Sequence, residues 1–476
     1  FPAMKALMQE GGITIANHIS AAYCSPARGQ MLTGKYSSYV NMDGTASQLH
    51  IYEATIGHEM KSAGYYTAHI GKWGVGWTKS LYTPLFKGFD QSFGYYGNSA
   101  QKYEKEISTG DKNELEDVGY TGSYVDLWED GRWAGTQSIY FGEGEEDAEL
   151  DAYLPKIFSS KVQTFLEEYS EKDTDAPFFL YFASDLAHSP YVAPAYYTER
   201  CNDSVIVNNS TGDDIDGIKK KCAMMLVLDE TIGNLTCKLE SLGMAENTLL
   251  AFASDNGGDV PGDNYPYLGG KFYEVEGGIK TPAAIFGSLI PEKKRGTSYS
   301  NLFHVTDWLP TLMQMATKGE WTGSVMGPEN VIDGVSHWDH LMGSSSSEVR
   351  PRDSALTYVD GDGRISIIQY QDEKLYHFMR GLEKEATLEP DQLYTVGGKS
   401  YTTCEVSDLS FAGMLPAVAT RFFLRTKVAI ADGTAAAMDM TSGVSTMTRL
   451  AMLAMLASLV ALTLGSLLYR LHAARK

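Results

Sequence analysis

Polar side chains follow two short apolar runs of the sequence. Asp185 and His188 come just after residues 178–184, and Asp255 and Asn256 come directly after residues 248–254. Uninterrupted apolar runs of this length are typical of strands that are buried on both faces of a sheet. In open α/β sheets, ligands bind beyond the carboxyl ends of the strands. Each of the four residues alone is most simply an ordinary loop residue, so this pattern indicates a place for a site but no chemistry.

A cysteine and an arginine stand close together in the run Cys24-Ser-Pro-Ala-Arg28. On its own, this run could be a buried structural thiol in a turn. Three further segments argue against that interpretation. They are Gly64-Tyr-Tyr-Thr-Ala-His-Ile-Gly-Lys-Trp73, Ser254-Asp-Asn-Gly-Gly258 and Glu276-Gly-Gly-Ile-Lys-Thr-Pro282.

Together these segments resemble the sulfatase family, and most closely its arylsulfatase B-like branch, the N-acetylgalactosamine-4-sulfatase type. Three more runs support the resemblance: Leu32-Thr-Gly-Lys-Tyr36, Lys87-Gly-Phe-Asp-Gln-Ser-Phe-Gly-Tyr95 and His304-Val-Thr-Asp-Trp-Leu-Pro-Thr311. The resemblance extends with few breaks from residue 1 to about residue 315, and more weakly to about residue 400. It implies the alkaline-phosphatase-like fold, an α/β fold with a large mixed, mostly parallel sheet flanked by helices.

The resemblance implies a nucleophile made from Cys24. In sulfatases a dedicated formylglycine-generating enzyme oxidises the cysteine of this motif to formylglycine during secretion, so Cys24 would be the thiol that forms no disulfide. The aldehyde hydrates to a gem-diol, and one hydroxyl attacks sulfur and displaces the alcohol. The second hydroxyl then re-forms the aldehyde and expels sulfate, which avoids the hydrolysis of a sulfate ester.

The resemblance also implies which residues bind the ester and its leaving group. A sulfate ester is anionic and needs fixed cations, even in an acidic chain. Arg28 would hold the nucleophile, and Lys72 and Lys271 would contact sulfate. His188 would help to protonate the leaving group.

A calcium ion is the cofactor that the resemblance implies. Asp255 and Asn256 match ligands of this ion that follow a strand, and residue 24 would complete their contact with it. Hard oxygen ligands suit Ca²⁺, and the ion would polarise the nucleophile and a sulfate oxygen.

The chain departs from the family at two places. Family members complete the calcium site with two adjacent Asp residues, upstream of the segment where this chain begins, and we expect that an N-terminal segment is missing. The second departure is internal, because the family's Gly-Lys-Trp is normally followed by His and here by Gly74. In the family that His assists sulfate expulsion, and neither His69 nor a residue close to it obviously replaces it.

The body of the chain is expected to alternate helices and strands. Residues 156–169 and residues 225–242 have the periodicity of amphipathic helices, and the second helix is expected to end at Gly243. With the two apolar runs, this order predicts an α/β fold with a largely parallel sheet. Residues 364–370 and 374–379 are expected to form an antiparallel hairpin.

A membrane helix is expected at residues 450–469, which are 20 residues without a charge between Arg449 and Arg470. At 1.5 Å per residue they span about 30 Å, the thickness of a bilayer core. The basic tail 470–476 is expected in the cytosol, so everything before it would lie outside the cell or in a lumen. We therefore divide the chain into a catalytic domain (1–345), a small α+β subdomain (350–402), a stalk (405–448), the membrane helix and the tail.

Two other features agree with a secretory route. Glycosylation sequons begin at Asn202, Asn208, Asn209 and Asn234. Five cysteines are expected to form one or two disulfides in an oxidising compartment, which leaves at least one thiol unpaired. They are Cys24, Cys201, Cys222, Cys237 and Cys404.

The net charge of the chain disfavours one class of partner. The 476 residues contain 39 Lys and Arg against 60 Asp and Glu, a net charge of −21, so nucleic-acid binding is disfavoured. Residues 104–151 carry 15 acidic side chains against three basic ones. We interpret this segment as a solvated surface insertion rather than a calcium loop, because EF-hand spacing is absent.

We therefore expect a membrane-anchored, lumenal or extracellular sulfatase that hydrolyses sulfate esters of sugars or aryl alcohols. One alternative is a phosphoryl hydrolase of the same superfamily, although the runs that contain Lys72 and Glu276 favour sulfate. The other alternative is a pseudoenzyme, a binding ectodomain that keeps the pocket without turnover. Gly74 is the feature that keeps this last alternative open.

Overall fold

The computed structural model describes residues 2–40, 42, 48–98, 125–134, 152–201, 214–262, 264–327, 330–345, 349–359, 365–371, 374–380, 394–396 and 399–401. All of these residues belong to one compact unit. Most of the acidic segment, the expected stalk, the expected membrane helix and the expected cytosolic tail lie outside the described residues. So do the first three sequons and Cys404.

Both helices that the sequence predicts are confirmed, as α6 and α9, among the α-helices of the described residues. These α-helices are α1 (Pro2–Ala6), α2 (Cys24–Thr33), α3 (Ile56–Ser62), α6 (Leu154–Ser170), α7 (Ala195–Arg200), α9 (Ile215–Ser241), α10 (Glu276–Ile279), α11 (Trp308–Ala316) and α12 (Trp338–Met342). The two apolar runs form β6 and β7. The strands are β1 (Gly12–Ile19), β2 (Tyr66–Lys72), β3 (Gln91–Tyr95), β4 (Trp128–Glu129), β5 (Arg132–Trp133), β6 (Phe178–Ala183), β7 (Leu250–Ala253), β8 (Ala283–Phe286), β9 (Thr297–His304), β10 (Ser354–Val359), β11 (Ile365–Gln371), β12 (Lys374–Arg380), β13 (Tyr394–Val396) and β14 (Lys399–Tyr401).

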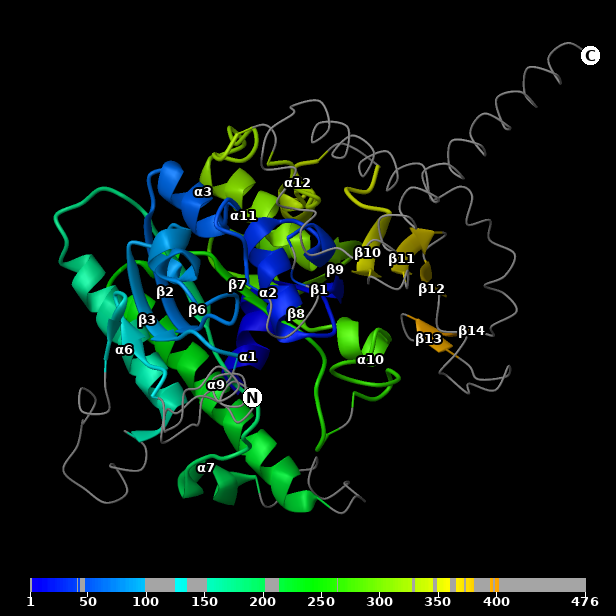
Figure 1. Cartoon of the computed structure of the whole chain (residues 1–476), viewed down its shortest axis with the longest axis horizontal. Coiled ribbons are helices and arrows are strands. Elements are labelled where there is room, and N and C mark those ends of the chain that lie inside the picture. Colours follow the sequence, from blue (N-terminus) through cyan, green and yellow to red (C-terminus); the bar gives the residue numbers. More distant parts are fainter. Residues whose placement is uncertain are drawn as a thin grey trace, which may run out of the picture. The chain divides into compact units, whose positions relative to one another are not determined.

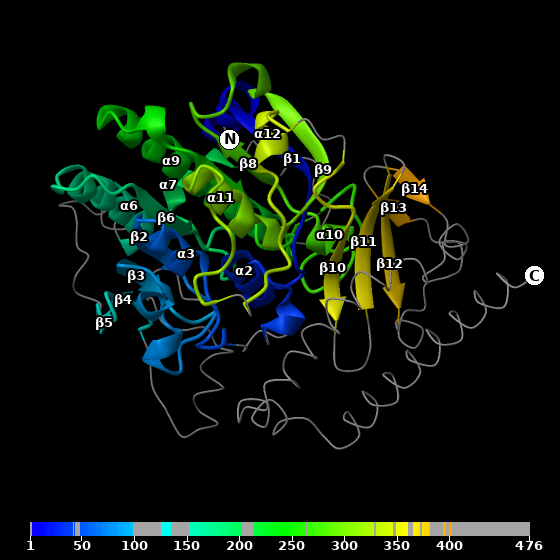
Figure 2. The same cartoon turned by 90° about the horizontal axis from the view of Figure 1, so that it is seen from above.

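One sheet has the strand order β5-β4-β3-β2-β6, with β2 parallel to both β3 and β6. Apolar residues of α6 and α9 pack on one face, and those of α3 and α11 pack on the other face. Successive side chains of β6 alternate between these two layers, with Leu180 in the first and Phe179 and Tyr181 in the second. Figures 1 and 2 show β2, β3 and β6 between these helices. The layers bury β2 and fix the position of Lys72 at its end.

A second sheet has the order β7-β8-β1-β9. β1 runs parallel to β9 but antiparallel to β8, and β8 is also antiparallel to β7. In the first sheet, β4 and β5 add antiparallel pairs. The expected mixed character is confirmed, but the prediction of one large, mostly parallel sheet is wrong, because these strands form two sheets with more antiparallel than parallel pairs. The apolar runs on which it rested carry no information about strand direction. The two strands are also only partly buried, since Ala183 alone is buried in β6 and Ala251 is exposed in β7.

A cavity of about 1840 Å³ lies between β6 and β7, which are each at the edge of their sheet. Every residue of both strands lines it, together with apolar side chains of α9 and α11. Asp185, His188, Asp255 and Asn256 line the same cavity. The polar residues that follow the two apolar runs therefore share one space, although their strands belong to different sheets.

The predicted C-terminal hairpin is confirmed. β11 pairs antiparallel with β12, and β10 adds a third strand. Ala355 of β10 and Ile368 of β11 are buried in one cluster with Ile19 and Ala22. The described part of the expected subdomain thus packs against the segment that leads to Cys24.

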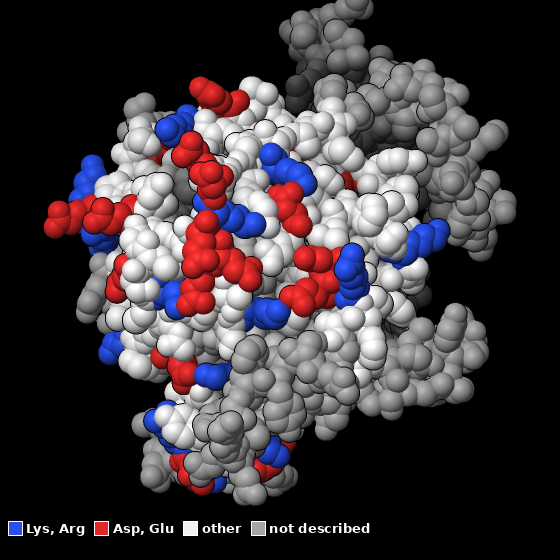
Figure 3. Space-filling model, turned by 90° about the vertical axis from the view of Figure 1, so that its left-hand side faces the viewer, with Lys and Arg blue, Asp and Glu red and all other residues white. Residues whose placement is uncertain are grey.

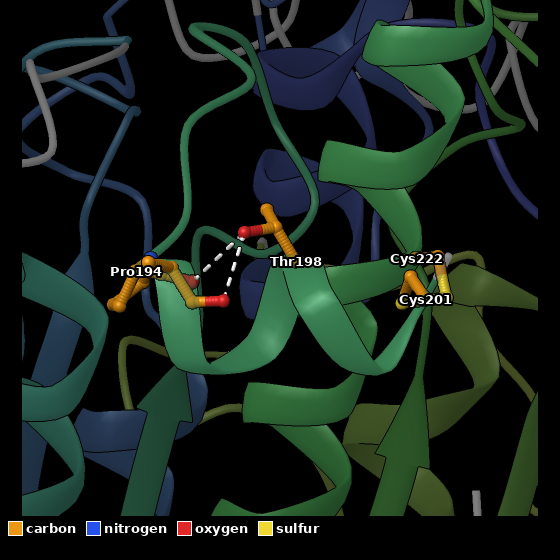
Figure 4. The surroundings of a disulfide bond; sticks show 5 residues. Pro194, Thr198, Cys201 and Cys222 are labelled. Carbon is orange, nitrogen blue, oxygen red and sulfur yellow. Dashed lines mark hydrogen bonds between the residues drawn. A yellow bond between two sulfur atoms is a disulfide. The ribbon is translucent and has the colours of Figure 1, made fainter. Parts of the chain in front are cut away.

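One disulfide joins Cys201, after α7, to Cys222 on α9 (Figure 4). Next to it, the Thr198 hydroxyl donates hydrogen bonds to the carbonyl groups of Pro194 and Ala195, at 3.4 and 3.0 Å. Cys24, which is buried, and Cys237, which is exposed, carry no disulfide. A structural disulfide is typical of proteins that fold in an oxidising compartment.

Within the described residues, none of the helices has the length and apolar character needed to cross a membrane. Figure 3 shows acidic and basic side chains interspersed on one face of the molecule. The basic side chains form no continuous patch on that face.

Candidate active site

Cys24 is the first residue of α2, and its side chain is only 8% exposed. Tyr23 precedes the helix with an extended backbone, and all the residues from Cys24 to Gln30 are buried. The first N–H groups of a helix lack partners within it and carry partial positive charge. The motif therefore places its thiol where the backbone favours an anionic group.

His188 faces this thiol from the loop after β6. Its Nε2 atom lies 3.9 Å from Cys24 Sγ, and its Nδ1 atom lies 2.7 Å from the carbonyl oxygen of Ser189. A carbonyl oxygen only accepts hydrogen bonds, so Nδ1 carries the hydrogen and donates. In the neutral ring, Nε2 is then left as an acceptor that faces Cys24.

Lys271 reaches the same ring nitrogen from the loop between β7 and α10. Its Nζ atom lies 2.9 Å from Nε2 of His188, and the lysine side chain is almost fully buried. The backbone N–H of Lys271 donates to the carbonyl of Gly258 at 3.0 Å, which fixes the start of the side chain. His188 therefore stands between a buried cation and the thiol.

Arg28 ties α2 to the ends of three strands. Its Nε atom donates to Asp255 Oδ2 at 3.2 Å, and its Nη1 atom donates to the carbonyl of Lys72 at 3.1 Å and to the hydroxyl of Tyr181 at 3.4 Å. The guanidinium is only 6% exposed. These bonds hold the Arg28 guanidinium in place and tie it to the backbone of Lys72.

Burial and neighbouring charges act in opposite directions on this cluster. Burial alone would lower the pKa of Arg28, but Tyr181, Asp255 and Cys24 raise that pKa above its ordinary value. Burial alone would raise the pKa of Asp255, but the cations around it, with Arg28 first, lower that pKa below its ordinary value. Burial lowers the pKa of Lys72, and Cys24 only partly opposes it. Asp255 is thus held ionised inside a group of positive charges.

A side chain at position 74, where the chain has glycine, would point into the site. The φ of Gly74 is +69°, and a Cβ atom at this position would lie 3.0 Å from Lys72 Cε and 3.5 Å from Arg28 Cδ. His69 does not take this place. It is fully buried beside Ser92 and the carbonyl of Lys72, and burial lowers its pKa to about 3.

Two buried tyrosines join the site without having been assigned to it from the sequence. Tyr95 pairs with Lys72 across β3 and β2, and its hydroxyl is buried without a hydrogen-bond partner among the described residues. Burial, and then Asp185, raise the pKa of Tyr95 well above its ordinary value. Tyr181 contacts Arg28, as above. Aromatic residues inside strands are most simply core, so only the parallel pairing with Lys72 could have singled out Tyr95.

Asp255 and Asn256 fit a hard cation in the kind of ligand they offer. Asn256 Oδ1 is buried and accepts no hydrogen bond from the described residues, while its Nδ2 donates to the carbonyl of Gly257 at 2.8 Å. A buried amide oxygen without a donor, next to an ionised carboxylate, matches the oxygen ligands that Ca²⁺ prefers. In the described ranges, no group of three or more His, Cys, Asp or Glu residues could hold a metal ion. Since Ca²⁺ takes 6–8 oxygen ligands, these two residues supply only part of a set.

The structure thus brings the residues expected at the site into one place: Cys24, Arg28, Lys72, His188, Asp255, Asn256 and Lys271. A family model described as Sulfatase matches residues 1–318. The chain belongs to the sulfatase family. Arylsulfatase J from Mus musculus is 28% identical over 348 residues, which cover 71% of this chain and 51% of that protein. N-acetylgalactosamine-6-sulfatase from Canis lupus familiaris is 24% identical over 394 residues, which cover 77% of this chain and 65% of that protein.

This member of the sulfatase family therefore spans about half to two thirds of the length of these relatives. Its structure is similar to the crystal structure of Ps i-CgsB in complex with k-i-k-neocarrahexaose, with a TM-score of 0.65 and 18% identity, over 88% of this chain and 86% of that one. The likeness confirms the expected α/β, alkaline-phosphatase-like fold. These relatives support the family as a whole and do not single out its arylsulfatase B-like branch.

Proposed function

We propose that this chain hydrolyses sulfate esters at residue 24. The observation that carries this proposal is the position of His188, whose Nε2 lies 2.9 Å from Lys271 Nζ and 3.9 Å from Cys24 Sγ. A nucleophile, a proton carrier and a cation are thus within reach of one reacting group. Membership of the sulfatase family supports the same reaction.

His188 and Lys271 would handle the proton of the leaving alcohol. Nδ1 of His188 keeps its hydrogen and donates it to the carbonyl of Ser189, so only Nε2 changes between acceptor and donor. Lys271 donates to Nε2 and can restore the proton that this atom gives away. Arg28 is held by its own hydrogen bonds, and the cationic groups of Arg28 and Lys72 would stabilise the negative charge of the ester and its transition state.

Formylglycine and Ca²⁺ belong to this proposal. Formylglycine, formed from Cys24, would supply a hydrated aldehyde as nucleophile, and the buried thiol that carries no disulfide agrees with it. Asp255 and Asn256 would hold part of the shell of a Ca²⁺ ion, which would supply positive charge to the anionic ester. The remaining oxygen ligands would come from groups other than these two side chains.

The substrate that we propose is a sulfated sugar or an aryl sulfate, in an arylsulfatase B-like branch. The branch rests on the sequence runs that follow Cys24 and precede Pro282. The sugar is supported by a relative named N-acetylgalactosamine-6-sulfatase and by a similar structure that holds a hexaose.

The first test measures modification and turnover of the full chain, produced together with a formylglycine-generating enzyme. The peptide that contains residue 24 should lose sulfur and gain an aldehyde, and the protein should cleave 4-nitrophenyl sulfate faster than 4-nitrophenyl phosphate. With a sugar sulfate, whose leaving alcohol needs a proton, His188→Ala should slow the release of the alcohol by about 10²–10⁴-fold, the usual contribution of a general acid. Cys24→Ser removes the thiol from which formylglycine would form. Its matched control is Cys237→Ser, which changes an exposed thiol. Active protein in which Cys24 stays unmodified would contradict the proposal.

Two alternatives are outcomes of the same experiment. Preference for the phosphate ester would indicate a phosphoryl hydrolase. Binding of sulfate esters without turnover, in protein that carries the aldehyde, would indicate a pseudoenzyme, which Gly74 keeps open.

We also propose that the catalytic part lies in a lumen or outside the cell, anchored by residues 450–469. The disulfide between Cys201 and Cys222 and the exposed sequon residue Asn234 on α9 support a secretory route. Protection of the disulfide-bearing part from protease in sealed microsomes would test this topology.

A further inference from the structure

Phe272 has an unusual backbone at the edge of the candidate site. It directly follows Lys271, and its φ is +76°, in the left-handed region that side chains other than glycine rarely adopt. Such a conformation costs free energy and persists where the surrounding structure enforces it, often at functional sites. Contacts of the loop around Phe272 must therefore enforce this conformation.

Hydrogen bonds on both sides hold this loop in place. The N–H of Phe272 donates to the carbonyl of Ala22 at 2.9 Å, which ties the loop to the segment before Cys24. The side chain of Asn264 donates to the carbonyls of Gly258 and Gly269, at 3.0 and 3.1 Å. The loop is thus ordered before any ligand binds, which removes part of the entropic cost of binding.

The ring of Phe272 contacts the residue before Cys24 and lies near the buried lysine. It packs edge-on against Tyr23, the residue before Cys24, with the ring centroids 5.6 Å apart. Lys271 Nζ lies 5.2 Å from the centroid of the Phe272 ring. Even so, the side chain is 46% exposed.

The contacts of Phe272 explain how its backbone is held, but its side chain gains little burial from this conformation. A single exposed aromatic residue is ordinary on a protein surface. Here, however, the backbone is strained and the ring gains only partial burial in return. An exposed ring held rigidly next to the nucleophile and the sulfate-contacting lysine is what a ligand-binding surface requires.

We propose that Phe272 is a specificity-determining residue that stacks against a six-membered ring in the leaving alcohol. This inference rests on the proposed function, in which Lys271 contacts sulfate. The carbon that bears the sulfate group is only two bonds from sulfur, so the ring of the alcohol lies beside Lys271 and within reach of Phe272. The negative face of an aromatic ring attracts the polarised C–H groups of a pyranose and also stacks with an aryl ring.

The test compares ligands with and without a ring. Equilibrium binding of galactose 4-sulfate, phenyl sulfate and inorganic sulfate is measured calorimetrically on the full chain and on F272A, both with Cys24 left as a thiol so that no ester is cleaved. We expect F272A to weaken binding of at least one ring-bearing ester by about 3- to 10-fold, the usual size of one aromatic contact, and to leave inorganic sulfate unchanged. Loss for the pyranose alone would identify a sugar, and loss for phenyl sulfate alone would identify an aryl group.

Three further variants separate recognition from folding. F272W should keep the affinity for the ring-bearing ester, and F272G should lose it although its backbone strain is relieved. F86A removes another phenylalanine of similar exposure, 53%, and should change no affinity. Equal weakening of all three ligands, or no weakening in F272A, would overturn the inference. If binding of a ring-bearing ester depends on Phe272 but the protein shows no turnover, the inference is retained and the proposed function is rejected. If the protein turns over sulfate esters but F272A binds the ring-bearing esters as tightly as the unaltered protein, the proposed function is retained and the inference is rejected.

Discussion

At the residue scale, Gly74 stands where the family normally has the histidine that assists sulfate expulsion. A side chain at this position would point toward Lys72 and Arg28, but φ is +69°. Histidine is among the residues that tolerate the left-handed region better than most. The clash with Lys72 Cε involves the far part of a flexible side chain, which can move. The position thus admits an imidazole at a modest cost in stability.

We therefore predict that G74H speeds turnover and lowers stability. With an aryl sulfate, the unaltered protein should release a burst of one alcohol per site and then turn over slowly, because sulfate expulsion lacks the family's His. G74H should speed the slow phase and leave the burst unchanged, at a cost of about 1 kcal/mol in the free energy of unfolding. The control is G74A, which introduces the same backbone strain without an imidazole and should not speed the slow phase. Stopped-flow kinetics without a burst would show that an earlier step limits the rate.

The residues with ionic or nucleophilic side chains were predictable from the sequence, but the tyrosines were not. Cys24, Lys72, His188 and Lys271 meet as the motifs imply. Tyr95 and Tyr181 join them through strand pairing and the layering of a sheet, neither of which short motifs encode. Phe272 was missed for a similar reason, because a positive φ cannot be read from a phenylalanine in a sequence.

At the scale of elements, the close approach of β2 to β6 positions both Lys72 and the loop that carries His188. Gly71 pairs with Ala183 in parallel register, and its φ is +113°. A Cβ atom on Gly71 would lie 2.1 Å from the carbonyl oxygen of Ala183. Backbone atoms cannot rotate away as a side chain can, so any other residue would push the two strands apart.

We predict that G71A lowers the free energy of unfolding by about 3 kcal/mol, from overpacking and backbone strain together. The matched control is G64A, since Gly64 also has a positive φ, +87°, but a Cβ atom there meets nothing within 4 Å. G64A should therefore lose only about 1 kcal/mol, the cost of the backbone conformation. Urea unfolding of both variants measures the difference. Equal losses would show that strain alone, and not strand spacing, makes glycine necessary.

The existence of these elements was easier to predict than their directions. The periodicity of α6 and α9 and the apolar runs of β6 and β7 all appear in the structure. β8 runs antiparallel to its neighbours on both sides, β1 and β7, and β6 and β7 lie at the edges of two sheets. The direction of a strand relative to its neighbours depends on long-range pairing and on the path of the connecting segments. Local hydrophobic patterns in the sequence predict neither of these.

At the scale of the whole molecule, a buried ion pair joins the C-terminal strands to the rest of the described unit. Arg352, just before β10, donates through Nη2 and Nε to Asp307 at 2.6 and 2.9 Å. His337 Nε2 contacts the same carboxylate at 3.1 Å. Burial alone would raise the pKa of Asp307, but Arg352 and His337 outweigh it and hold that pKa well below its ordinary value.

We predict that this pair makes stability depend on pH under acidic conditions. A carboxylate with a lowered pKa contributes stability that is fully present above its unfolded pKa, about 4, and is lost as pH falls through the folded value. D307N should lower the free energy of unfolding at neutral pH by about 3–5 kcal/mol, because Arg352 is left buried without its counter-charge. Below about pH 4 the difference between D307N and the unaltered protein should shrink, since the unaltered protein loses the same contribution there. The control is D216N, in an exposed pair with Lys220 on α9, which should change stability by less than about 1 kcal/mol at any pH. A difference between D307N and the unaltered protein that stays constant from neutral to acidic pH would show that the asparagine disturbs packing, and that the charge of Asp307 does not hold the C-terminal strands in place.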